Sequence, residues 1–200
     1  MKQSTIRYAL ITAAIALILS LSGIFASFAP RQVIEGRLTL DVVTLVVMLG
    51  AAGYVTGGAA RKEGNGGILI NAVAGSLIVG VILAIFVVIE ANVDLTFVFP
   101  NLRQPARATL AFGQDIFPGV VALILLSLVI GVTAALLLIA PARWRSAILY
   151  SFALTVVIGL LESQIQNIIT LPDALAVAAA FAAGYAVSVL FRLPLIPRLI

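Results

Sequence analysis

Residues 64–89 read GNGGILINAVAGSLIVGVILAIFVVI and contain no charged side chain. A helix that crosses a bilayer needs about 20 such residues. Five further stretches are also free of charge: 8–30, 42–60, 116–142, 146–161 and 174–191. Lipid offers no hydrogen-bond partners to the backbone, so segments of this kind must be helices. The pattern predicts an all-α, polytopic membrane protein with about six transmembrane helices.

The composition agrees with this prediction. Hydrophobic residues make up 62% of the chain and charged residues 10%, with a mean hydropathy of +1.22. Soluble domains have about 25% charged residues. The 12 basic residues lie singly or in pairs between apolar runs, which does not favour a nucleic-acid-binding surface. The chain has no Cys and no His, so thiolate and imidazole chemistry are excluded.

The distribution of charge predicts the topology. The expected helices span about 8–28, 40–58, 67–89, 118–139, 148–168 and 173–191, in a single membrane domain 1–200 with an external interfacial segment at about 91–117. If the amino terminus is cytoplasmic, 8 of the 12 basic residues lie on the inside, leaving 4 outside. This asymmetry is typical of positive-inside insertion. We therefore expect a multi-pass protein of the cell membrane, surrounded by lipid, with both termini cytoplasmic.

The first apolar segment allows a second interpretation. Lys2 and Arg7 precede an apolar run that ends in Ser27-Phe28-Ala29, as in a cleaved signal peptide. However, the run is longer than the 7–15 residues typical of such a peptide. Cleavage after Ala29 would also leave Pro30 as the first residue. The sequence favours an uncleaved helix.

The external segment is the longest connection between helices. Pro105 stands where the first turn of a helix tolerates proline, and Gly113 where a helix commonly ends. Leu102, Ala106 and Leu110 share one helical face. We expect a short helix at the outer interface. A substrate gate is the alternative interpretation of the same segment.

Small residues four positions apart mark the expected helix contacts, because small side chains let helix backbones approach closely. The candidate packing residues are Gly53, Gly57, Ser76, Gly80, Gly184 and Ser188. The second and sixth segments share Ala-Ala-Gly-Tyr, at 51–54 and 182–185, followed in each case by an Arg seven residues after the Tyr. Duplication and convergence on small-residue packing explain this similarity equally well.

Two polar residues within the predicted spans are candidates for a functional site. Asn71 is the only amide in the body of the third helix and can form an interhelical hydrogen bond or bind a substrate. Glu162 lies near the outer end of the fifth helix, where its carboxylate can reach interfacial water. We find no catalytic constellation and no metal or cofactor motif, so the sequence argues against an enzyme.

Three runs of the chain carry a resemblance to a transporter family. They are 98–102 (Val-Phe-Pro-Asn-Leu), 110–114 (Leu-Ala-Phe-Gly-Gln), and the Gly53-Tyr54 helix that ends in Arg61-Lys62. Together they resemble an amino-terminal membrane extension found ahead of the permease domain in some branched-chain amino acid ABC transporter permeases. The resemblance implies amino acid import, with an ABC permease core and its cytoplasmic ATPase as partners.

The chain departs from a complete permease in one respect. Such permeases dock their ATPase through a cytoplasmic, helix-forming Glu-Ala-Ala segment, and neither short inside loop, 59–66 or 140–147, can supply it. Two classes of function therefore remain open. The chain is either a module of an ABC importer that does not itself hydrolyse ATP, or a non-transporting membrane scaffold or assembly protein.

Overall fold

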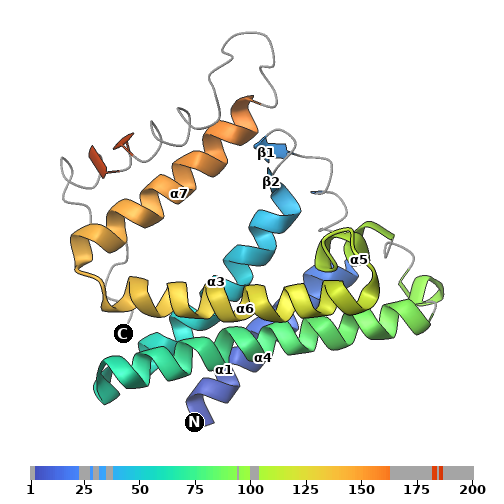
Figure 1. Cartoon of the computed structure of the whole chain (residues 1–200), viewed down its shortest axis with the longest axis horizontal. Helices are drawn as coiled ribbons and strands as arrows, with labels where there is room; N and C mark the ends of the chain where they lie inside the picture. Colours follow the sequence, from blue (N-terminus) through green and yellow to red (C-terminus); the bar gives the residue numbers. More distant parts are fainter. Residues whose placement is uncertain are drawn as a thin grey trace. The chain divides into compact units, whose positions relative to one another are not determined.

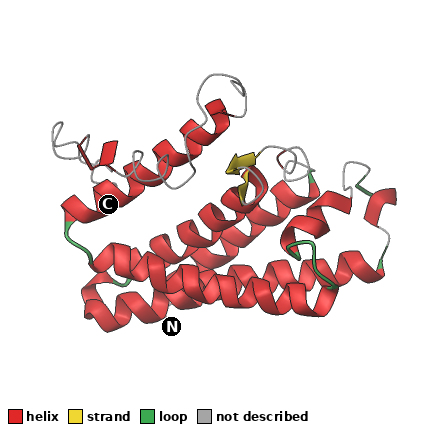
Figure 2. Ribbon diagram, turned by 45° about the horizontal axis from the view of Figure 1, so that its top comes forward, coloured by secondary structure: helices red, strands yellow, loops and turns green. Residues whose placement is uncertain are grey.

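The computed structural model describes residues 3–22, 28, 32–34, 38–93, 95–99, 104–162, 182–183 and 185–186. Its main helices are α1 (Gln3–Leu21), α3 (Leu40–Ala59), α4 (Gly64–Asn92), α5 (Gln104–Leu110), α6 (Ile116–Ile139) and α7 (Ala142–Glu162) (Figure 1). Two short 3-10 helices, η1 (Arg61–Glu63) and η2 (Leu95–Phe97), flank α4. Among the described residues, the strands are limited to β1 (Gln32–Ile34) and β2 (Leu38–Thr39), drawn in yellow in Figure 2. The predicted all-α class is confirmed.

Four helical segments in the described part of the chain are long and apolar enough to cross a membrane. They are Gln3–Leu21, Leu40–Ala59, Arg61–Asn92 and Ile116–Ile139. Helix α7 is not among them. The sixth predicted span, 173–191, falls almost wholly outside the described residues. The four helices indicate a membrane protein, and the count of six spans stays a prediction.

Two helix boundaries differ from the sequence-based expectation. Helix α1 spans Gln3–Leu21 rather than about 8–28, because polar residues at its start can continue a helix beyond the hydrocarbon layer. The Ser22 hydroxyl donates to the Leu19 carbonyl oxygen at its end (3.0 Å). Helix α7 begins at Ala142 rather than near 148, directly after Pro141. The Arg145 N–H donates to the Pro141 carbonyl oxygen (3.1 Å), which closes the first turn.

The chain divides into two compact units. Unit 1 comprises Met1–Pro30 and Leu40–Ile139, and unit 2 comprises Arg31–Thr39 and Ala140–Ile200. In unit 1, α4 is the central helix and packs against α1, α3 and α6. Helices α4 and α6 lie side by side along their lengths (Figures 1 and 2).

The contacts in unit 1 set the helix directions. Along α3, Gly50, Gly53 and Gly57 meet Ile130, Ala134 and Leu138 of α6 in the same order, so these two helices are parallel. Gly57 also meets Ile68 and Ala72, whereas Gly53 meets Ala72 and Ser76. The order is reversed, so α4 runs antiparallel to α3 and α6. Helix α1 is parallel to α4, since its first turns bond the first turns of α4 through Thr5 and Asn71.

Apolar side chains fill the interior of unit 1 and also cover its outside. The main core includes Leu45, Leu49, Leu83 and Leu123, all fully buried. Large apolar side chains point outward from all four long helices, among them Ile15, Val47, Ile70, Ile85, Leu125 and Leu136. An apolar exterior of this kind suits a lipid environment.

Unit 2 is smaller in its described part. Strands β1 and β2 pair antiparallel, with Gln32 opposite Thr39, and β1 packs against α7. The exposed ring of Trp144 lies 6.3 Å from that of Tyr185, at an interplanar angle of 43°. Aromatic pairs of this geometry are favourable, and the contact brings the start of α7 to Tyr185.

Candidate functional site

Helix α3 comes close to both α4 and α6 at Gly53. A Cβ atom added there would lie 2.5 Å from Ser76 Oγ on α4 and 3.1 Å from Ala134 Cβ on α6. It would also lie 3.1 Å from the Ala72 carbonyl oxygen. No real Cβ atom can occupy such a position without movement of its neighbours. Glycine at 53 is therefore what allows α3 to meet both other helices at once.

The same type of contact recurs along the three helices. A Cβ atom on Gly57 would lie 2.8 Å from Leu138 Cδ1 and 2.9 Å from Ala72 Cβ, and one on Gly131 would lie 2.8 Å from Val73 Cα. A Cβ atom on Gly80 would collide with Ser127. We call this line of contacts the small-residue seam; it comprises Gly53, Gly57, Ala72, Ser76, Gly80, Ser127 and Gly131. The seam closes the space between α3, α4 and α6.

Hydroxyl groups in and beside the seam bond to backbone carbonyl groups. Ser76 Oγ donates to the Leu49 carbonyl oxygen of α3 (2.8 Å), which links two helices. Thr56 Oγ1 donates to the Ala52 carbonyl oxygen (2.7 Å), and Ser127 Oγ to the Leu123 carbonyl oxygen (2.7 Å). All three side chains are fully buried. These hydroxyl protons are thus used within the protein and are not directed at a solute.

Asn71 lies at the contact between α1 and α4 and is 4% exposed. Its Oδ1 accepts a hydrogen bond from Thr5 Oγ1 (2.6 Å). Its Nδ2 donates to the Gly67 carbonyl oxygen (2.8 Å) and, at 3.5 Å, to Glu63 Oε2. The amide is therefore engaged on both sides by protein groups, in an arrangement that ties the amino-terminal helix to the start of α4.

A second polar contact holds α5 at the opposite end of unit 1. Asp41, in the first turn of α3, is 4% exposed, and its Oδ1 accepts from the Val42 N–H (2.8 Å). Thr109 Oγ1 donates to Asp41 Oδ2 in a short hydrogen bond. A carboxylate is favourable at a helix amino terminus because the helix dipole is positive there. Asp41 is therefore both a helix-terminal anion and the anchor of α5.

Apolar packing and charge support the same position of α5. Leu110 and Ala111 are buried in the main core, and α5 packs against α3, α4 and α6. The charge of Arg107 acts on Glu90 in the last turn of α4. Glu90 Oε2 is itself buried and has no hydrogen-bond partner among the described residues. The short helix thus packs against the bundle, and its place at the outer membrane interface stays a prediction.

The end of α5 has a tight turn. Phe112 has φ 54° and Gly113 has φ 67°, both in the left-handed region. The Gly113 N–H donates to the Ala108 carbonyl oxygen (2.7 Å). This bond closes the carboxyl end of the helix in the manner typical of glycine and turns the chain toward α6.

Four of the candidate residues predicted from the sequence lie together in the structure. Gly53, Gly57, Ser76 and Gly80 come together in the small-residue seam. Asn71 lies apart from it, at the α1–α4 contact. Gly184 and Ser188 fall outside the described residues, and Glu162 is described only as the last residue of α7.

Sequence reasoning missed two features. The contact face of α1 is a stripe of small buried residues, Thr5, Ala9, Ala13, Ala16 and Ser20. Its four-residue spacing from Thr5 to Ala13 is the signal that could have revealed it. The Asp41–Thr109 bond joins residues 68 positions apart, and no local pattern reports such a contact.

The described residues contain no group of His, Cys, Asp or Glu that could hold a metal ion. Ionisable side chains in unit 1, such as Arg7, Asp41, Glu63 and Glu90, lie near helix ends. The fold defines a class, a bundle of apolar helices that indicates a membrane protein. Comparisons with known protein families, with curated proteins and with solved structures find no match to this chain.

Proposed function

We propose that this chain is a non-catalytic membrane module that works by packing against other membrane proteins. The observation that carries the proposal is the closed small-residue seam. Backbones and small side chains fill the space between α3, α4 and α6, and the buried hydroxyl groups there bond to carbonyl groups of the protein. A solute path along this seam would have to break these contacts.

The outward surface supports the same proposal. Large apolar side chains on α1, α4 and α6 are free to contact lipid or neighbouring helices. Without a hydrophobic driving force in lipid, helices associate through close packing and hydrogen bonds. A rigid bundle with apolar outer faces provides surfaces for close packing.

The partner that we propose first is the permease core of an ABC importer for branched-chain amino acids. This choice rests on the resemblance carried by residues 98–102, 110–114 and the Gly53-Tyr54 helix. The chain would contribute membrane helices to the transporter, and separate subunits would bind the substrate and hydrolyse ATP. The cell membrane is the proposed location.

Co-purification tests this proposal. The tagged chain is expressed with the permease and ATPase subunits of a branched-chain amino acid importer from the same cell, and an unrelated polytopic membrane protein serves as control. We expect a complex with the permease that survives detergent purification and is absent for the control protein. Purification of the chain without the permease would contradict the proposal and favour the scaffold alternative.

A further inference from the structure

The amino-terminal end of α1 presents a positive charge on its outer face. The buried residues of this end, Thr5 and Ala9, face α3 and α4 within unit 1. Arg7 is exposed, as are Ile6 and Ile11. Arg7 therefore lies on the side of α1 that points away from the bundle, within a helix long and apolar enough to span a membrane.

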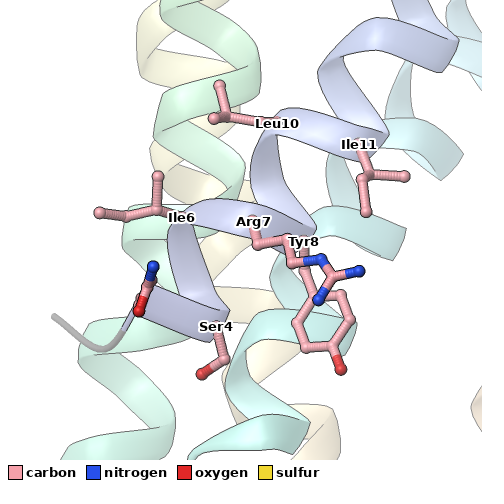
Figure 3. Close-up of a pocket in the computed structure, with 7 residues that line it drawn as sticks. Ser4, Ile6, Arg7, Tyr8, Leu10 and Ile11 are labelled. Carbon is pink, nitrogen blue, oxygen red and sulfur yellow. The ribbon is translucent and has the colours of Figure 1, made fainter.

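An open hollow lies along this face (Figure 3). Its lining includes Ser4, Ile6, Arg7, Tyr8, Leu10 and Ile11. Polar and charged groups are concentrated in its first turn, and the aliphatic side chains of Leu10 and Ile11 lie one turn further along the helix. One turn is about 5.4 Å, so the hollow changes from polar to apolar over the depth of a lipid headgroup region.

No described acidic group neutralises Arg7. Its guanidinium group has no hydrogen bond or ion pair among the described residues, and Glu63, which is linked to the start of α1 through Asn71 and Thr5, bonds to Asn71. Arginine stays charged at any physiological pH. A permanent cation on the outer face of a spanning helix is costly unless it reaches the membrane interface, where water and anionic headgroups are available to it.

We propose that this hollow binds an anionic glycerophospholipid from the leaflet on the side of the chain's amino terminus. The Arg7 guanidinium group would bind the lipid phosphate, for which its planar donors are suited. Ser4 and Tyr8 can donate hydroxyl protons to the glycerol and headgroup oxygens. Leu10 and Ile11 would contact the first methylene groups of an acyl chain. The site requires neither a particular orientation of the protein nor an importer partner.

The chain offers a matched control in Lys62. This residue is also an exposed cation, but it lies in η1, outside the hollow. If charge attraction alone were sufficient for lipid binding, Lys62 and Arg7 would contribute equally to that binding. If the hollow is a site, only Arg7 matters, because only Arg7 is flanked by aliphatic side chains that can hold an acyl chain.

The experiment uses the full chain in mild detergent, with phosphatidylglycerol, phosphatidylcholine or millimolar inorganic phosphate added. Native mass spectrometry measures bound lipid, and thermal unfolding measures stabilisation. We expect phosphatidylglycerol to be retained and to raise the Tm by several degrees, with no effect of inorganic phosphate. Phosphatidylcholine should give a much smaller shift.

The variants decide the assignment. Arg7→Gln should lose the phosphatidylglycerol adduct and its Tm shift, Arg7→Lys should keep part of both, and Lys62→Gln should behave like the parent. Arg7 is exposed, so its loss should leave the Tm without lipid unchanged. Equal retention of phosphatidylglycerol by Arg7→Gln and the parent would overturn the proposal. An equal loss in Lys62→Gln would also overturn it, because binding would then follow charge alone.

Discussion

Gly53 illustrates how one residue determines the packing of three helices. The space for its missing side chain is occupied by Ser76, Ala72 and Ala134. Glycine is unfavourable in a helix by about 1 kcal/mol relative to alanine. At Gly53 this cost in helix stability is offset, because a larger residue would prevent the close approach of the helix backbones in the seam. Gly58 differs, since no atom lies within 4 Å of a Cβ atom built on it.

The same substitution should therefore have opposite effects at these two glycines. Gly53→Ala should lower the free energy of unfolding by about 1–3 kcal/mol, as expected for an overpacked core. Gly58→Ala should leave it unchanged or raise it by up to about 1 kcal/mol. Thermal unfolding in detergent measures both. Equal Tm values for the two variants would show that α3, α4 and α6 do not meet at Gly53.

The hydrogen bond between Thr5 and Asn71 allows a second test at this scale. In a double-mutant cycle with Thr5→Val and Asn71→Ala, we expect a coupling of about 0.6 kcal/mol, the average for polar contacts between membrane helices, and at most about 1.7 kcal/mol. Thr12→Val is the control, since the Thr12 hydroxyl is exposed and donates only to the Tyr8 carbonyl oxygen of its own helix. Its cycle with Asn71→Ala should give no coupling. A coupling near zero for Thr5 would mean that α1 is not anchored through Asn71.

At the scale of elements, α5 is held by contacts from different parts of unit 1. Asp41 of α3 accepts from Thr109, and Leu110 and Ala111 are buried in the main core. The helix spans only Gln104–Leu110. Isolated helices of this length are unstable in water. Its position must therefore depend on these tertiary contacts.

Loss of the Thr109 hydroxyl should release this segment. We expect a single cysteine at the buried position Leu110 to react slowly with a thiol reagent in the parent background and faster in a Thr109→Val background. The chain contains no cysteine of its own, so the label reports on one site. Thr133→Val, which removes an exposed hydroxyl bonded within α6, should leave the labelling rate unchanged. If Thr109→Val also leaves it unchanged, the bond to Asp41 does not hold α5.

Sequence patterns predicted some of these helices accurately and others poorly. Apolar runs predicted α3 and α6 nearly to the residue, because hydrophobic length is a local property. Spacing of small residues identified Gly53 and Gly57. The position of α5 could not be predicted in this way, since it depends on Asp41 and Thr109 meeting across 68 residues. The start of α7 was misplaced because Arg143 and Arg145 were counted as loop residues, although the helix begins directly after Pro141.

At the scale of the whole molecule, the fold of unit 1 places α5 and the Asn71 contact at opposite ends of the bundle. If the bundle spans a membrane, these ends face opposite compartments. The charge distribution predicts that the Asn71 end is cytoplasmic. Thr109 is buried and is unsuitable for labelling, whereas Gln114 and Asn65 are exposed at the two ends.

Labelling of intact cells tests this orientation. An impermeant thiol reagent should modify a Gln114→Cys variant and leave an Asn65→Cys variant unmodified until the membrane is permeabilised. Permeabilised cells provide the control, since both cysteines should then react. The reverse pattern in intact cells would invert the topology. Labelling of both variants before permeabilisation would argue against a membrane-spanning bundle.

The claim that the bundle packs with partners and transports nothing alone is tested most directly by solute uptake. The purified chain is reconstituted into liposomes, and the uptake of radiolabelled leucine, isoleucine and valine is measured with and without an ion gradient. We expect uptake equal to that of empty liposomes under every condition, because the small-residue seam closes the space between α3, α4 and α6. Gradient-dependent accumulation of any of these amino acids by the isolated chain would contradict the proposed non-transporting role and identify a small secondary carrier.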